Sequence, residues 1–83
     1  MNPRPVSVKA LQDYELLVTF ENDEVKVFDV KPLLHRPVFK ALTNKALFNI
    51  VKIVHKSVYW NEDLDICPDM VYEDSRTVED AID

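Results

Sequence analysis

Residues 15–29, ELLVTFENDEVKVFD, determine the fold that the sequence predicts. Leu16, Val18 and Phe20 are spaced two residues apart, so they share one face of an extended strand. The Asn22-Asp23 pair suits a tight turn, because Asn and Asp tolerate left-handed backbone conformations. Apolar and β-branched residues after the turn form the returning strand. The stretch therefore predicts a β-hairpin with one buried face.

Segments on both sides of this hairpin extend the prediction to a small α+β domain. Residues 6–11 (VSVKAL) add a strand before it and complete a three-stranded antiparallel meander. Pro32 and Pro37 are each suited to start a short helical segment. Residues 50–56 and 58–60 have strand composition and predict a second hairpin or a bent strand, of which we adopt the hairpin. We expect a small curved antiparallel β-sheet, made of the meander and this hairpin, with short helices packed on it.

The second half of the chain predicts further helical turns and a polar end. Asn44 is placed to cap a turn that carries Phe48, and Pro68 is placed to open another short helix. The segment from Asp74 to Asp83 is mostly polar, which predicts either disorder or one weak helical turn. The expected organisation is a single α+β domain over residues 1–73 followed by an acidic tail over residues 74–83.

Composition excludes several classes of protein. The chain has 83 residues, 47% of them hydrophobic, a net charge of −5 and no glycine. Without glycine, neither a phosphate-binding loop nor a dinucleotide-binding fingerprint can form. Cys67 is the only cysteine, so an intrachain disulfide and a cysteine-based zinc site are excluded. No apolar run could span a bilayer and no secretory signal is present, so we expect a cytoplasmic protein, without membrane contact and without a cofactor.

Charge is distributed unevenly along the chain. Residues 61–83 contain nine acidic residues against the single base Arg76, whereas residues 25–60 contain seven bases against the single acid Asp29. Such runs are commonly the solvated faces of ordinary elements. The leading functional hypothesis is a non-catalytic interaction module that docks on a small basic protein partner. The expected partner-binding residues are acidic: Glu62, Asp63, Asp69, Glu73, Asp74, Glu79 and Asp80.

Two other hypotheses follow from different residues. The basic region from Lys26 to Lys56 favours a nucleic-acid-associated regulatory module, with a homodimer formed through exposed strand edges as one arrangement. A negative net charge and the lack of a long basic helix weigh against it. Cys67 with His35 or His55 would be a thiol enzyme, but the spacing of these residues matches no catalytic or metal signature. We therefore expect no catalytic and no metal-binding residues.

Two further carboxylates are expected to serve structure rather than binding. Asp65 lies shortly before Pro68, where a short acceptor can take hydrogen bonds from the free N–H groups of a helix N-terminus. Asp29 lies near the end of the third predicted strand, residues 25–30, where the strand pattern changes to a helical one. Both are predicted as structural polar residues.

Several of these segments together resemble a known bacterial family, domain of unknown function 2442. The resemblance covers roughly residues 5–73, and its most specific parts are Phe28-Asp29 and the segment from Trp60 through Asp65 and Pro68 to Tyr72. It implies a small α+β domain with a curved antiparallel sheet, found alone in the cytoplasm or fused ahead of a helix-turn-helix module. No activity is established for the family, so it implies no catalytic residues. Gene pairing with small basic partners implies an antitoxin-like role for its stand-alone members.

Overall fold

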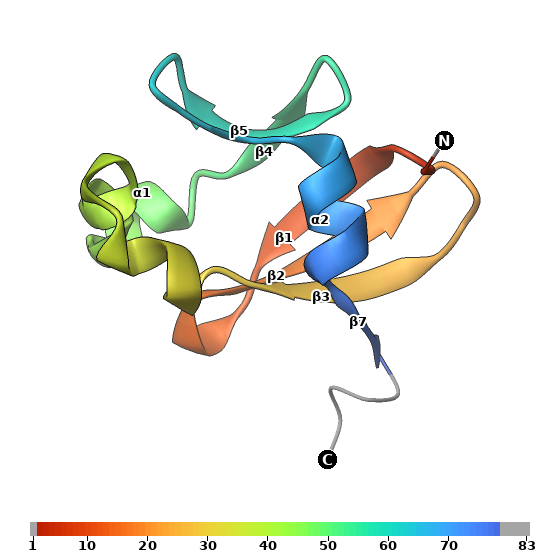
Figure 1. Cartoon of the computed structure of the whole chain (residues 1–83), viewed down its shortest axis with the longest axis horizontal. Helices are drawn as coiled ribbons and strands as arrows, with labels where there is room; N and C mark the ends of the chain where they lie inside the picture. Colours follow the sequence, from red (N-terminus) through yellow and green to blue (C-terminus); the bar gives the residue numbers. More distant parts are fainter. Residues whose placement is uncertain (1, 79–83) are drawn as a thin grey trace.

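A computed structural model describes residues 2–78 and contains two antiparallel sheets with short helices (Figure 1). The first sheet has the order β1-β2-β3-β7, and the second has the order β4-β5-β6. The strands of the first sheet are β1 (Pro5–Ala10), β2 (Glu15–Phe20), β3 (Val25–Asp29) and β7 (Arg76–Thr77). Those of the second sheet are β4 (Lys52–Val54), β5 (Ser57–Asn61) and β6 (Leu64–Ile66). The predicted α+β class is confirmed.

The described helices are short, and those after residue 30 begin where the sequence predicts, whereas the helical turn at residues 12–14 was not predicted. Three of them are 3₁₀ helices: η1 (Gln12–Tyr14), η2 (Lys31–His35) and η3 (Pro37–Thr43). The α-helices are α1 (Lys45–Phe48) and α2 (Pro68–Asp74). A proline occupies the first turn of η2, η3 and α2, where its missing N–H group costs no hydrogen bond. The Asn44 side chain caps α1 by accepting the Ala46 N–H at 3.0 Å.

The second hairpin does not extend the first sheet, and this corrects the expectation of one continuous sheet. The strands β4 and β5 of this hairpin pair with each other, and β6 pairs with β5. The three strands form a separate sheet. The alternation in β6 explains the addition, since Leu64 and Ile66 are buried while Asp65 faces solvent. The Asn61 side chain supports the turn before β6 by accepting the Asp63 N–H at 2.9 Å. The two sheets meet where β1 packs against β4.

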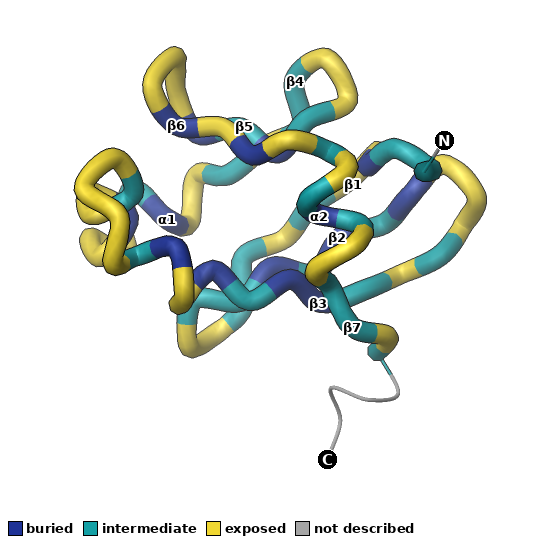
Figure 2. Tube along the Cα trace, viewed as in Figure 1, coloured by how far each residue is buried: buried dark blue, intermediate teal, exposed yellow. Residues whose placement is uncertain are grey.

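The hydrophobic core lies between the two sheets and is covered by the helices. Leu16, Val18 and Phe20 are fully buried, as their alternation in β2 predicts. Trp60 is buried and donates its indole N–H to the Phe48 carbonyl at 3.0 Å, so burial leaves no unpaired donor on this ring. Figure 2 shows the buried segments on the inner sides of β2, β3, β5 and α1.

The domain continues past residue 73, which corrects the boundary expected from the sequence. β7 pairs antiparallel with β3, with Arg76 opposite Val27 and Thr77 opposite Lys26. The Arg76 guanidinium also forms an ion pair with Glu15 of β2. The segment predicted as an acidic tail thus begins with Asp74, the last residue of α2, and continues into the edge strand β7, while Glu79 and Asp80 lie outside the described residues.

Turns in this glycine-free chain use other residues in the left-handed region. Five described residues have positive φ: Asp13 (60°), Tyr14 (61°), Asp23 (70°), His55 (51°) and Lys56 (62°). Asp23 is at the predicted hairpin tip, where an Asp tolerates this conformation. Consecutive positive φ values in the β4–β5 turn match the right-handed twist of the two strands. Each such residue costs about 1–2 kcal/mol of backbone strain when it is not glycine.

Candidate interaction site

The acidic side chains of residues 62–74 face solvent and lack cationic partners. Within residues 2–78, the ion pairs are Lys31–Asp29, Lys56–Glu21 and Arg76–Glu15, and none of them involves this segment. The exposed carboxylates are those of Glu62, Asp63, Asp65, Asp69, Glu73 and Asp74. Their negative charge is therefore not compensated by a neighbouring Lys or Arg side chain.

The face of α2 brings two of these carboxylates together. Asp69 and Glu73 are one turn apart, so they lie on the same side of the helix. The Asn2 amide contacts both, at 3.5 Å from Asp69 Oδ1 and 2.8 Å from Glu73 Oε2. A neutral amide orients the two carboxylates without cancelling their charge. The pair therefore forms a small, fixed acidic surface.

The predicted partner-binding residues do not form one continuous surface. Glu62 and Asp63 occupy the turn between β5 and β6, and β6 lies between that turn and α2 along the chain (Figure 2). Asp69, Glu73 and Asp74 are on α2 itself. The structure thus divides the described acidic residues into a turn group and a helix group.

A pocket of about 320 Å³ lies beside the end of α2. Its apolar walls come from Phe28 of β3, Pro32 and Leu33 of η2, and Met70 of α2, and its polar lining comes from Asp29 and Asp74. The Asp29 carboxylate accepts the Lys31 N–H at 2.9 Å and lies 3.1 Å from Lys31 Nζ. It thereby joins the end of β3 to the start of η2. Sequence reasoning singled out both carboxylates but gave no signal that they share a pocket.

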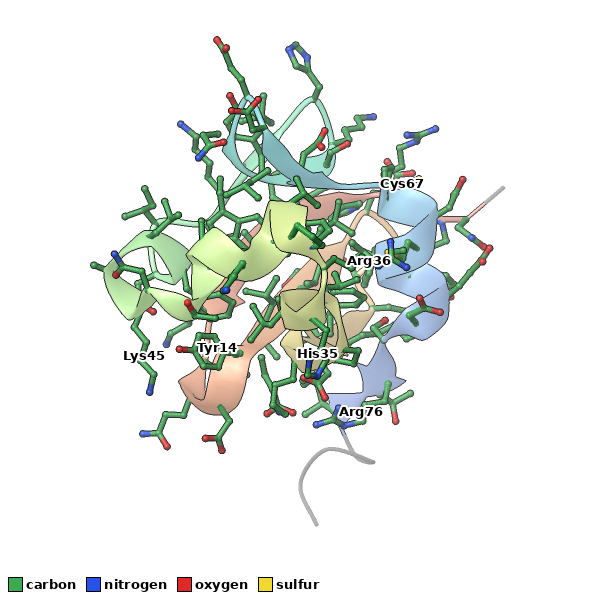
Figure 3. All side chains as sticks on the ribbon, turned by 60° about the vertical axis from the view of Figure 1, so that its left-hand side comes forward. Tyr14, His35, Arg36, Lys45, Cys67 and Arg76 are labelled. Carbon is green, nitrogen blue, oxygen red and sulfur yellow. The ribbon has the colours of Figure 1, made fainter. Side chains whose placement is uncertain are left out.

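A second pocket, of about 380 Å³, lies between η1 and α1. Tyr14 and Phe48 form its aromatic wall, with ring centroids 5.2 Å apart in an edge-to-face arrangement. The Tyr14 hydroxyl donates to the Thr43 carbonyl at 2.6 Å, which fixes the ring. Lys45 Nζ lies 5.6 Å from the centre of the Tyr14 ring, and Figure 3 shows the two side chains next to each other. The cation of this pocket is thus supplied from within the chain.

Tyr72 links α2 to the β2–β3 hairpin. Its hydroxyl donates to Glu24 Oε1 at 2.6 Å, and Lys26 Nζ lies 4.0 Å from the centre of its ring. The hydrogen bond from Tyr72, with a second one from Asn22, lowers the pKa of Glu24 below its usual value. The same hydrogen bond to Glu24 raises the pKa of Tyr72. These contacts hold the acidic helix in a fixed orientation on the sheet.

Comparison with protein families identifies the chain. A family model described as a protein of unknown function, DUF2442, matches residues 5–77. The chain belongs to the DUF2442 family. Comparisons with curated proteins and with solved structures give no match. The DUF2442 match ends at the last residue of β7, so the family domain and the first sheet end together.

The basic region of this DUF2442 domain is largely engaged in internal contacts. Lys26 Nζ donates to the Tyr72 carbonyl at 3.2 Å, and Lys31 Nζ donates to the Asp13 carbonyl at 2.9 Å. Lys56 pairs with Glu21, while Lys45 and Lys52 lie over tyrosine rings. Arg36 and Lys40 are exposed on or next to η3.

Cys67 and the two histidines of the DUF2442 domain occupy separate elements. Cys67 is exposed immediately before α2, His35 ends η2, and His55 is in the β4–β5 turn. Figure 3 shows Cys67 and His35 well apart. Within residues 2–78, no three His, Cys, Asp or Glu side chains are grouped so that they could hold a metal ion. No helix in this part of the chain has the length and apolar character needed to cross a membrane.

Contrary to the prediction from the sequence, Asp65 does not accept hydrogen bonds at the N-terminus of α2. It lies on the exposed face of β6, and the N-cap residue of α2 is Cys67, without a side-chain cap hydrogen bond. Strand alternation decides this outcome, because burying Leu64 and Ile66 turns Asp65 outward. Asp65 therefore adds to the exposed acidic residues of the segment.

Proposed function

We propose that this DUF2442 domain is a non-catalytic, antitoxin-like interaction module of the cytoplasm, which docks on a small basic protein through its C-terminal acidic residues. One observation carries the proposal: the exposed carboxylates of residues 62–74 form no ion pair within the described chain. Uncompensated charge of one sign attracts an oppositely charged partner and accelerates encounter.

The helix group is the preferred part of this surface. Asp69 and Glu73 are held in a fixed relation by the Asn2 amide, so little side-chain freedom is lost when a partner binds. Tyr72, on the same helix, is anchored to Glu24 and Lys26. A basic partner would thus meet a rigid surface with its negative charges already placed.

Affinity capture from a lysate of the protein's own host tests the proposal. The tagged chain is compared with the variant Asp69→Asn/Glu73→Gln, and co-eluting proteins are identified by mass spectrometry at low and high salt. We expect the wild type to retain a stoichiometric small basic protein at low salt and to lose it at high salt, because salt screens exposed charges. The double variant is expected to retain much less of it.

A matched control separates local charge from net charge. Asp13→Asn/Asp23→Asn removes the same number of charges from exposed turns outside the acidic segment. Asn tolerates the positive φ values of these two positions as well as Asp does. The control is expected to retain the partner at the wild-type level. A complex that survives both high salt and neutralisation of α2 would show that the acidic surface is not the docking site.

A truncation after Val78 tests the remaining acidic residues cleanly. It removes Glu79 and Asp80 while leaving β7 and the Arg76–Glu15 ion pair in place. A truncation after Glu73 would also remove an edge strand and confuse loss of charge with loss of fold. Partner retention by the Val78 truncation, together with its loss in the α2 variant, would locate docking on the helix.

A further inference from the structure

The pocket beside the end of α2 combines apolar walls with acidic residues. Its walls are apolar, since Phe28, Leu33 and Met70 contribute to them. Its polar lining consists of the carboxylates Asp29 and Asp74. An apolar ligand would bring no charge to the carboxylates, and a small cation would leave the apolar walls unused.

The two carboxylates of this pocket differ in their partners. Asp29 is already 3.1 Å from Lys31 Nζ and accepts a backbone N–H group. Asp74 is exposed and has no cationic partner among the described residues. Arg76, two residues beyond it, is paired with Glu15 instead. One negative charge of the pocket is therefore open to a cation from outside the chain.

Basic side chains fit such a combination. Lys and Arg carry an apolar stem that packs on hydrophobic surface while the charged group stays at the rim. Arginine fits better than lysine, because its planar guanidinium has five donors that can reach two carboxylates at once and is more weakly hydrated. A pocket of about 320 Å³ is large enough for a single side chain of this size.

We propose that this pocket binds an arginine side chain, with its stem against Phe28 and Met70 and its guanidinium on Asp74 and Asp29. The proposal rests on the proposed function in one respect, which is that the basic docking partner presents the arginine. It adds a specific anchor to a surface otherwise recognised by charge alone. Anchoring in a pocket contributes affinity and register that exposed ion pairs do not provide.

Nuclear magnetic resonance titration of the full chain with a defined probe tests the pocket. The probe is a blocked tripeptide, Ser-Arg-Ser, and the matched peptide carries citrulline, which is neutral but nearly isosteric with arginine. We expect the arginine peptide to shift the amide signals of Phe28, Leu33, Met70 and Asp74, and the citrulline peptide to shift them far less. Equal shifts with both peptides, or shifts that avoid these residues, would overturn the assignment.

A variant pair tests the role of charge at the rim. Asp74→Asn is expected to weaken binding of the arginine peptide about fivefold, which is the upper range for loss of an exposed charge pair. Asp23→Asn makes the same charge change at the tip of the β2–β3 hairpin, outside both the pocket and the acidic segment, and is expected to leave binding unchanged. Both residues are exposed, so neither variant disturbs the core. Equal affinity of the Asp74→Asn variant and the wild type would contradict the proposed site.

The pocket and the proposed function can fail separately. If the wild type retains a basic protein in the capture experiment and Asp74→Asn retains it equally, the function stands and the pocket assignment is wrong. If the arginine peptide binds the pocket as expected but no basic protein is retained, the pocket assignment stands and the proposed function is wrong.

Discussion

The acidic residues before residue 30 and those after residue 61 have different surroundings in the fold. Ion pairs hold three of the first group: Glu15 with Arg76, Glu21 with Lys56 and Asp29 with Lys31. A fourth, Glu24, accepts a hydrogen bond from Tyr72. The described acids after residue 61 have no ion pair and face solvent. Asp13 and Asp23, in exposed turns, form no ion pair either. Ion pairing thus occurs among the acids before residue 30 but not among the described acids after residue 61.

The largest effect is expected from reversing the charge of Arg76. Arg76→Glu removes the ion pair with Glu15, places two like charges together and weakens the pairing of β7 with β3. The free energy of unfolding is expected to fall by about 1.5 kcal/mol, measured by urea denaturation. Arg36→Glu is the control, because Arg36 is exposed and makes no ion pair in the described chain. Equal losses from both variants would mean that β7 contributes nothing to stability.

Neutralising one acid from each group gives a smaller and more direct comparison. Glu15→Gln is expected to lower the free energy of unfolding by about 0.5–1 kcal/mol, because an ion pair is lost. Asp69→Asn/Glu73→Gln is expected to change it by less than about 0.5 kcal/mol, since removing a favourable charge near the start of α2 offsets relief of repulsion one turn later. Thermal and urea unfolding of the two variants measure the difference. A larger loss of unfolding free energy from the α2 variant than from Glu15→Gln would mean that the α2 carboxylates, and not the ion-paired Glu15, stabilise the fold.

A third, smaller effect concerns the pKa of Glu24, which bonds to Tyr72 of α2. The folded-state pKa of Glu24 is lowered, so its stabilising contribution is complete above the ordinary pKa of a glutamate and is lost as pH falls through the lowered value. Tyr72→Phe removes the principal cause and is expected to return the Glu24 pKa toward its usual value. Nuclear magnetic resonance titration of the Glu24 carboxyl measures this change. Asn22→Ala removes the second cause and is expected to give a smaller shift in the same direction.

Titration of the wild type at alkaline pH tests the donor of the same hydrogen bond, the Tyr72 hydroxyl. The pKa of Tyr72 is raised, so its contribution to stability is complete below the ordinary pKa of a tyrosine and is lost as pH rises through the raised value. Absorbance titration is expected to show one tyrosine that ionises later than the others. Glu24→Gln is expected to reduce the delay, because a neutral amide accepts a weaker hydrogen bond and carries no charge, while burial still raises the pKa of Tyr72. A delay of unchanged size in this variant would assign the shift to burial.

Local patterns in the sequence were sufficient for most of the secondary structure. The spacing of Leu16, Val18 and Phe20 predicted the buried face of β2, and Pro68 predicted the start of α2. Asn44 predicted the cap of α1. Each of these features depends on residues close together in the chain, where propensity and hydrogen bonding act directly.

Features that depend on distant residues were not predicted. β7 is only two residues long, and it forms because β3 offers a free edge and Glu15 offers a carboxylate to Arg76. No local pattern predicts β6, because Leu64 and Ile66 are buried in a core that residues of both sheets form. The pocket at Asp29 and Asp74 unites residues 45 positions apart, which no local pattern reveals. Long-range pairing is the information that a single sequence lacks.

Left-handed turns without glycine have a consequence for the evolution of this domain. His55 is exposed at a φ of 51°, and within the described chain its side chain takes part in no hydrogen bond or ion pair. Glycine at this position would release about 1 kcal/mol of strain without deleting a contact. A single substitution could thereby offset a destabilising change elsewhere, such as a new side chain on the acidic face. The strain in the β4–β5 turn thus leaves room for a stabilising substitution, which would allow other surface positions to change while the fold persists.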